Sequence, residues 1–220
     1  MKLEGKKVFF LGDSITEGVG ASCSENCYVS VMERKYGIKA FNYGVSGTRL
    51  AIQSQPTVEA PAYDETFCER AKRMEGEPDI IVVFGGTNDF GHGDAPFGDL
   101  LDDAPYTFCG ACRDLFTYLQ KRYPLARIIV CTPAHRADEL NPRGDGLIKR
   151  YNVGTLKAYA DAIRKIAEDH SLPVCDLYRN LGINVLIPEH REALMPDGLH
   201  PNDAGHERLA DCIASFIQSL

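Results

Sequence analysis

Five short apolar segments recur along the chain, and each is followed by a longer amphipathic stretch. They are Lys7–Leu11, Ile38–Tyr43, Asp79–Phe84, Arg127–Cys131 and Pro173–Leu177. Segments this short and this apolar are typical of strands in a parallel sheet that is covered on both faces. Strands that alternate with helices form βαβ units with right-handed crossovers. The sequence therefore predicts an α/β protein, a three-layer α/β/α sandwich around a five-stranded parallel sheet.

The amphipathic stretches between and after these strands predict helices. The expected helices span Glu25–Tyr36, Tyr63–Met74, Ala104–Tyr123, Ile148–His170 and Asn202–Gln218. The chain has 220 residues and no repeat, low-complexity tract or linker, so a single domain over residues 1–220 is expected. A chain of this length buries roughly 70% of the surface that its unfolded form exposes, so its core needs no metal or disulfide.

The charge balance of the chain is acidic, with 24 basic and 31 acidic residues and a formal net charge of −7. Nucleic acids and anionic membranes select basic surfaces, so neither is expected as a partner. The apolar runs are far shorter than the ~20 residues that span a bilayer, and no cleavable apolar segment follows Met1. A cytoplasmic location is therefore expected.

The eight cysteines are expected to be reduced thiols rather than a disulfide framework. Two pairs, Cys23 with Cys27 and Cys109 with Cys112, have spacings that occur in metal sites. No histidine stands at zinc-finger spacing from either pair. Thiols in the core or at its boundary are therefore favoured over structural zinc, and no metal is expected.

The first strand ends in the segment Gly12–Thr16, which raises the question of what Ser14 does. Ser14 and Glu17 match the S-x-x-E capping box, in which the serine side chain accepts from a backbone N–H one turn on. Gly18 and Gly20 make a long helix unfavourable after this point. A single helical turn would allow Ser14 to be both a cap and a reactive group.

The later strand ends carry the groups that acyl-transfer chemistry needs. In open parallel sheets, ligands bind beyond the carboxyl ends of the strands. A serine nucleophile requires an imidazole to take its proton and a carboxylate to orient the imidazole. Ser14 could be the nucleophile, His200 the base and Asp197 its orienting carboxylate. A simple turn leading into the last helix is the alternative for the pair Asp197 and His200.

A tetrahedral intermediate also needs hydrogen-bond donors at its oxyanion. The backbone N–H groups of Ser14 and Gly44 and the side-chain amide of Asn88 are the candidate donors. A glycine at position 44 allows close backbone approach because no Cβ blocks it. Asp13 and Asp89 neighbour the proposed site and are interpreted as carboxylates that support the loops through hydrogen bonds.

Four segments together resemble a known family. GDSIT, NYGVSG, GGTND and DGLHPN match in order the four sequence blocks of the SGNH hydrolases, also called GDSL-type esterases and lipases. The family letters fall on Ser14, Gly44, Asn88 and His200. The resemblance implies a flavodoxin-like fold, ester hydrolysis by a Ser-His-Asp triad, and no cofactor. The α/β-hydrolase elbow G-x-S-x-G is disfavoured because Thr16 stands where its second glycine would be.

The loops suggest a small polar ester as the substrate. The segments Thr48–Tyr63, Phe90–Asp103 and Thr132–Leu147 are long and polar or glycine-rich, without an apolar stripe suited to a long acyl chain. Short acyl groups, such as acetyl esters of carbohydrates, are therefore favoured. A lysophospholipase or thioesterase acting on longer chains stays open, as does a non-catalytic protein that binds FMN or sugar.

Several further residues are candidates without a firm assignment. Arg49, Arg136 and Arg143 could contact a polar alcohol group or lie at the solvated surface. His92 and His135 follow the third and fourth strands, where a surface position is favoured over a place in the pocket. A last candidate, the loop Ala137–Gly146, is rich in proline and charge and could pack against a second subunit in a homo-oligomer.

Overall fold

The computed structural model describes residues 1–143 and 154–220. Three predictions fall partly outside these ranges. They are the start of the helix expected over Ile148–His170, the end of the loop Thr132–Leu147 and the end of the candidate subunit-contact loop Ala137–Gly146.

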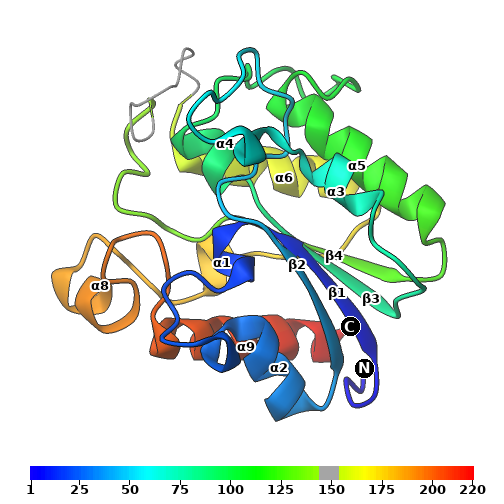
Figure 1. The fold of residues 1–220 in the computed structure, drawn as a ribbon, viewed down its shortest axis with the longest axis vertical. Coiled ribbons are helices and arrows are strands. Elements are labelled where there is room, and N and C mark those ends of the chain that lie inside the picture. Colours follow the sequence, from blue (N-terminus) through cyan, green and yellow to red (C-terminus); the bar gives the residue numbers. More distant parts are fainter. Residues whose placement is uncertain (144–153) are drawn as a thin grey trace.

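The centre of the fold is one sheet of five parallel strands in the order β2-β1-β3-β4-β5 (Figure 1). The strands are β1 (Lys7–Gly12), β2 (Lys39–Gly44), β3 (Ile80–Phe84), β4 (Arg127–Cys131) and β5 (Val174–Cys175). This order is that of flavodoxin-like proteins and confirms the predicted fold class. Gly12 pairs with Gly44 on one side and with Phe84 on the other, so three strands end level with one another.

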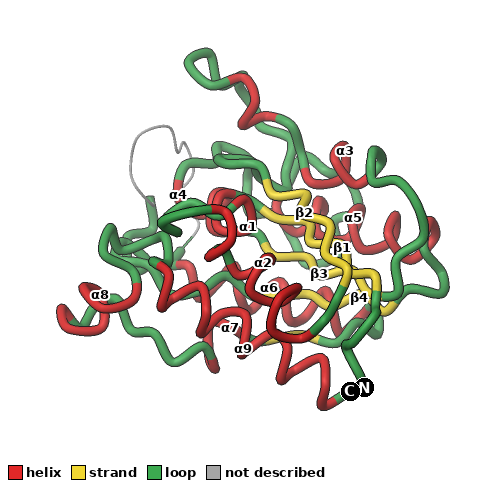
Figure 2. The backbone as a smooth tube through the Cα atoms, turned by 60° about the horizontal axis from the view of Figure 1, so that its bottom comes forward, coloured by secondary structure: helices red, strands yellow, loops and turns green. Residues whose placement is uncertain are grey.

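Helices cover both faces of the sheet, as Figure 2 shows from a second direction. Along β1, Val8 and Phe10 point to one core, and Phe9 and Leu11 point to the other. Because successive strand residues face opposite sides, an uninterrupted apolar strand supplies both cores. The first core lies under α2 (Tyr28–Tyr36) and α9 (Asp203–Ser219), and the second under α3 (Phe67–Ala71), α5 (Phe108–Arg122) and α6 (Leu156–Asp169).

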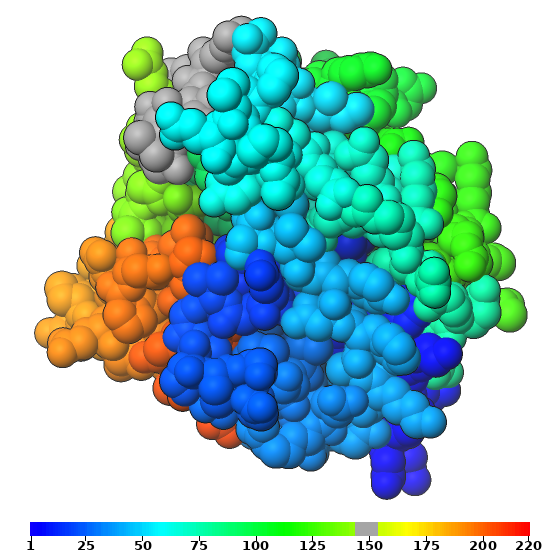
Figure 3. Space-filling view, viewed as in Figure 1, coloured from blue at the N-terminus to red at the C-terminus, as the bar shows by residue number. Residues whose placement is uncertain are grey.

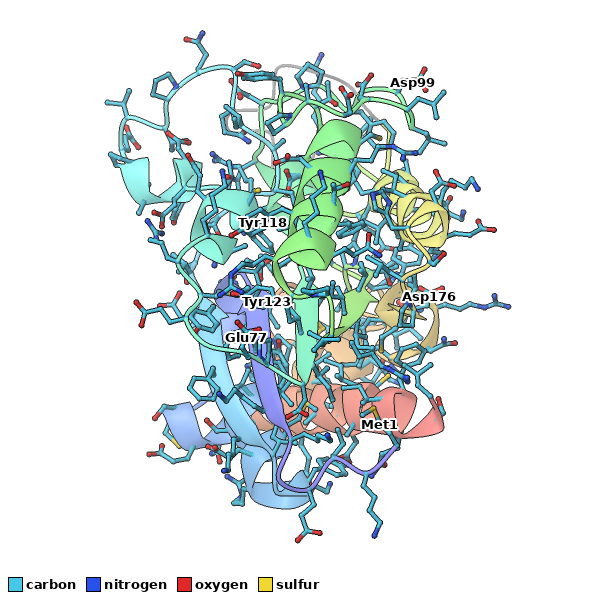
Figure 4. All side chains as sticks on the ribbon, turned by 90° about the vertical axis from the view of Figure 1, so that its right-hand side faces the viewer. Met1, Glu77, Asp99, Tyr118, Tyr123 and Asp176 are labelled. Atoms are coloured by element: carbon cyan, nitrogen blue, oxygen red, sulfur yellow. The ribbon has the colours of Figure 1, made fainter. Side chains whose placement is uncertain are left out.

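The second core extends to the end of α5. Tyr123, labelled in Figure 4, directly follows this helix and is buried. Its hydroxyl donates to the carbonyl oxygen of Met74 at 2.8 Å, and its ring meets Phe9 edge to face at 6.2 Å between centroids.

The edge strand β2 differs from the prediction of a buried strand, because Phe41 on it is 40% exposed.

Shorter helices complete the fold, and two of the predicted helices begin later than expected. The single-turn and short helices are α1 (Ser14–Glu17), α4 (Thr87–Gly91), α7 (Leu177–Asn180) and α8 (Pro188–Leu194), with 3-10 turns at Ser24–Asn26 and Pro61–Asp64. The helix expected over Tyr63–Met74 begins only at Phe67, because Thr66 forms a capping box with Glu69. The helix expected from Ala104 begins at Phe108, because the Thr107 hydroxyl accepts from the Gly110 N–H.

The two termini lie side by side, and the Met1 amino group donates to the Gln218 carbonyl oxygen at 2.5 Å (Figures 1 and 2). Within the described residues, no helix combines the length and the apolar character needed to cross a membrane. All eight cysteines are free thiols. Cys109 and Cys112 are buried in the second core, in agreement with the prediction of core thiols.

Candidate active site

Ser14 is the first residue of α1, directly beyond the end of β1. The helix is capped by Asp13, whose carboxylate accepts from the Ile15 N–H at 3.1 Å. The predicted capping box, with Ser14 as cap and Glu17 as its partner, is therefore wrong, because the capping residue is Asp13. Glu17 instead accepts from the Ser46 N–H at 2.6 Å and from the Ser46 hydroxyl. The Ser14 side chain is thus free of the capping role.

The Ser14 hydroxyl faces the loop that precedes α9. Its Oγ lies 2.9 Å from Nε2 of His200, and Nδ1 of the same ring lies 2.6 Å from Oδ2 of Asp197. The other carboxylate oxygen of Asp197 accepts from the N–H groups of Leu199 and His200 at 2.8 and 2.7 Å. In the space-filling view of Figure 3, the blue segment around α1, the light-blue segment after β2 and the orange segment before α9 adjoin. The structure therefore brings together the three predicted residues.

The carboxylate of Asp197 fixes which nitrogen of His200 carries the proton. Partial burial acts to raise the pKa of Asp197, but hydrogen bonds from the N–H groups of His200 and Leu199 and from the His200 ring outweigh it, so the pKa lies below its usual value. An ionised carboxylate only accepts hydrogen bonds, so Nδ1 of His200 is the donor. In the neutral ring, Nε2 is then the acceptor that faces the Ser14 hydroxyl.

Gly44 does not line the cavity beside Ser14. Its N–H donates to Oδ1 of Asn42 at 2.8 Å. A Cβ at this position would lie 2.1 Å from the Glu17 backbone nitrogen, so the glycine allows α1 to pack against β2. A close approach to Gly44 therefore occurs, as expected, but the group that approaches it is helix α1.

Gly47, three residues further on, lines the cavity together with Ser14 and Asn88. Its φ of +73° lies in the left-handed region, and a Cβ there would lie 2.2 Å from the Tyr63 ring, so both backbone and space require glycine. Gly47 was not among the predicted site residues. The signal that could have found it is a second glycine in NYGVSG, placed in the turn after the strand.

Asn88 lies in α4, immediately beyond β3, and is 4% exposed. Its amide nitrogen donates to the Thr48 carbonyl oxygen at 3.0 Å, and its Oδ1 accepts from Nε2 of His92 at 3.2 Å. The neighbouring Asp89 carboxylate accepts from the N–H groups of Leu50 and Ala51, both at 3.0 Å. Asp89 thus supports the loop after β2, as predicted, whereas Asp13 caps α1.

The cavity at Ser14 has a volume of about 260 Å³. Besides Ser14, Gly47, Asn88 and His200, its walls include Tyr63, His92 and Arg136. The surface position predicted for His92 is therefore wrong. Within residues 1–143 and 154–220, no cluster of three or more histidine, cysteine or acidic residues could hold a metal ion.

The three candidate arginines lie in different places. Arg49 is 1% exposed and Arg136 is 5% exposed, whereas Arg143 is at the surface. Arg136 borders the cavity, where its guanidinium donates to Asp138 and to the Thr87 carbonyl oxygen. Arg49 is held behind the cavity wall and contacts His92.

A serine paired with an imidazole and a carboxylate, at the carboxyl edge of a flavodoxin-like sheet, is an arrangement typical of hydrolases that use a serine nucleophile. Residues 10–208 match the model of the GDSL-like lipase/acylhydrolase family. The chain therefore belongs to this family, as its four sequence blocks predicted.

Three relatives illustrate the similarity. A solved structure of a protein from Lactobacillus plantarum has a TM-score of 0.82 and 29% identity, over 98% of each chain. A GDSL lipase of Mycobacterium tuberculosis is 30% identical over 148 residues, which are 67% of this chain and 53% of that protein. An acetylxylan esterase of Xylanibacter ruminicola is 23% identical over 239 residues, covering 99% of this chain and 44% of the esterase. The chain thus spans about half the length of these two curated relatives.

Proposed function

We propose that the protein hydrolyses carboxylic esters with Ser14 as nucleophile, His200 as base and Asp197 as the carboxylate that orients His200. The observation that carries this proposal is the continuous contact from Ser14 Oγ to His200 Nε2 at 2.9 Å and from His200 Nδ1 to Asp197 at 2.6 Å. Family membership over residues 10–208 supports the same chemistry.

The reaction proceeds in two halves. His200 takes the Ser14 proton while Oγ forms a bond to the ester carbonyl carbon, and the alcohol then leaves with that proton. Water attacks the acyl-enzyme in the second half, gives its proton to His200, and the carboxylic acid leaves as Ser14 Oγ regains a proton. Asp197 stabilises the imidazolium in both halves and is not itself protonated.

Three groups are proposed to stabilise the oxyanion. The first is the Ser14 N–H, which as the first amide of α1 has no partner within its helix. The second is the side-chain amide of Asn88, which keeps one N–H after donating the other to Thr48. The third is the N–H of Gly47, which lines the cavity, in place of the N–H of Gly44, which is held by Asn42.

The substrate is proposed to be a short-chain ester of a polar alcohol, such as an acetylated carbohydrate. A cavity of about 260 Å³ suits a small acyl group, and the walls carry Arg136 and Tyr63 as polar or aromatic contacts for an alcohol portion. The acetylxylan esterase among the relatives acts, by its name, on an ester of this kind.

Hydrolysis of p-nitrophenyl acetate by Ser14→Ala tests the proposal. We expect kcat to fall by at least about 10³-fold, because the nucleophile is lost. Ser24→Ala is the matched control, since Ser24 is exposed and lies away from the cavity, and it should retain wild-type activity. An unchanged rate in Ser14→Ala would contradict the serine mechanism.

A further inference from the structure

A chain of hydrogen bonds runs from Arg49, behind the cavity wall, through His92 to Asn88, which both line the cavity. The guanidinium of Arg49 donates to Nδ1 of His92 from Nε at 3.1 Å and from Nη2 at 2.7 Å. On the other side of the ring, Nε2 of His92 lies 3.2 Å from Oδ1 of Asn88. The three residues come from the loop after β2 and from α4 with its C-terminal end. The chain therefore links two loops that border the site.

The chemistry of Arg49 determines the tautomer of His92. A guanidinium has only donors, so Nδ1 of His92 must be an acceptor and carry no proton. The ring proton is then on Nε2, from which it is donated to Oδ1 of Asn88. Arg49 itself is 1% exposed and is fixed by Thr57 and Asp64, each at 3.0 Å from its Nη1. The donor facing Asn88 is therefore set by a buried, immobilised cation.

The orientation of the Asn88 amide follows from this donor. Because His92 donates to Oδ1, the amide cannot rotate by 180° without placing its own NH₂ group against the His92 N–H. The Nδ2 group is thereby directed toward Thr48, whose carbonyl oxygen accepts one proton at 3.0 Å, and the second proton is kept for the cavity. A hydrogen bond to an amide oxygen also polarises the amide, which strengthens its N–H as a donor.

We propose that His92 is a positioning residue for the hydrolysis reaction, which holds and polarises the Asn88 amide as an oxyanion donor, and that Arg49 sets the tautomer this requires. The inference rests on the proposed function, because it assigns Asn88 to the oxyanion. His92 acts through Asn88 and takes no part in proton transfer. The contribution of His92 is therefore expected in kcat more than in KM, since the oxyanion develops only in the transition state.

Two substitutions at position 92 separate the donor function from the rest of the ring. Glutamine can place an N–H near the position of Nε2 and an oxygen toward Arg49, whereas asparagine reaches only the position of Nδ1. On p-nitrophenyl acetate, we expect His92→Asn to lower kcat about tenfold with KM within about twofold of wild type, less than the ~10²–10³-fold that follows loss of a whole oxyanion donor. His92→Gln should recover kcat to within about threefold of wild type.

A double-mutant cycle with Asn88→Ala distinguishes positioning from a general structural role. If His92 acts through Asn88, His92→Asn should cause less than about a twofold further loss of kcat in the Asn88→Ala background. The same tenfold loss in both backgrounds would overturn the proposal, because the effect would then not pass through Asn88. Equal losses in His92→Gln and His92→Asn would also overturn it. Thermal unfolding of each variant verifies that the measured chains are folded.

Failure of this inference can be told apart from failure of the proposed function. Wild-type protein that does not hydrolyse the ester, or a Ser14→Ala variant that is as active as wild type, contradicts the proposed function and this inference with it. An active, Ser14-dependent enzyme with an additive cycle contradicts only the role of His92.

Discussion

Asp13 brings an ionisable group into a buried position directly before Ser14. It is 2% exposed, and burial raises the pKa of its carboxyl group from 3.8 to about 6, against the opposing effects of the Ile15 N–H and of the Arg70 charge. The folded state therefore binds a proton that the unfolded state has already released between these two values. Stability falls as the pH rises through this interval and stays lower above it.

The Asp13→Asn variant should remove this pH dependence. An asparagine side chain can still accept from the Ile15 N–H and is a favourable N-cap, but it does not ionise. Between pH 5 and pH 8 the wild-type free energy of unfolding should fall by about 1–2 kcal/mol relative to that of the variant. Urea unfolding of both proteins at the two pH values measures the difference. The same difference at pH 5 and pH 8 would show that Asp13 does not titrate in this range.

At the scale of elements, one side-chain contact ties α1 to β2 and a second ties α1 to the loop after β2. Asn42 donates from its amide to the Thr16 carbonyl oxygen at 2.7 Å, and Glu17 accepts from the Ser46 N–H at 2.6 Å and from the Ser46 hydroxyl. These contacts set the position of the Ser14 amide relative to the turn that contains Gly47. The single turn of α1 depends on them, because an isolated turn of helix has little stability of its own.

Loss of the Glu17 side chain should therefore weaken oxyanion stabilisation. We expect Glu17→Ala to lower kcat on p-nitrophenyl acetate by about tenfold, since the loop after β2 loses its connection to α1. Ser46→Ala is the comparison, because it removes only the hydroxyl contact and keeps the bond from the Ser46 N–H, so its loss should be about threefold or less. A larger loss of kcat in Ser46→Ala than in Glu17→Ala would mean that the serine hydroxyl, and not the contact between Glu17 and the loop after β2, is responsible for the loss.

The elements that the sequence predicted well are those fixed by local pattern. The strand Arg127–Cys131 has the predicted bounds, because the four residues after Arg127 are apolar and buried in a sheet that is covered on both faces. The short helices α4 and α8 were not predicted. A helix of five or seven residues is stabilised by its surroundings more than by its own sequence, so no period marks it in advance.

Residues of the site divide in the same way. Ser14 and Asn88 follow the ends of β1 and β3, where the fold rule places ligands, and could be found from their position in the sequence. His200 lies in the loop before α9 and could be found from its spacing to Asp197. Gly47 was missed because β2 extends to Gly44, which leaves the turn for the later glycine. The place of His92 depends on Arg49, 43 residues earlier, and long-range pairing of this kind leaves no trace in the local pattern.

For the molecule as a whole, the size of the cavity leads to a prediction about acyl chain length. The site has about 260 Å³, and its polar lining comes from α1, α4, the loops after β2 and β4, and the loop before α9. In a series of p-nitrophenyl esters, we expect kcat/KM to be highest for acetate or butyrate and to fall at least about tenfold by octanoate, because a longer acyl chain does not fit in a cavity of this size. A maximum at eight carbons or more would contradict this and favour a lysophospholipase or thioesterase.

Covalent labelling with a fluorophosphonate tests whether Ser14 is the nucleophile of an esterase. The reagent reacts with a serine that an adjacent imidazole activates, and the adduct is measured as the mass of the intact chain and of its Ser14 peptide. We expect one adduct per chain, on Ser14, in wild type and in Ser24→Ala, and none in Ser14→Ala. An adduct that persists in Ser14→Ala, or its absence from wild type, would show that Ser14 is not the activated nucleophile.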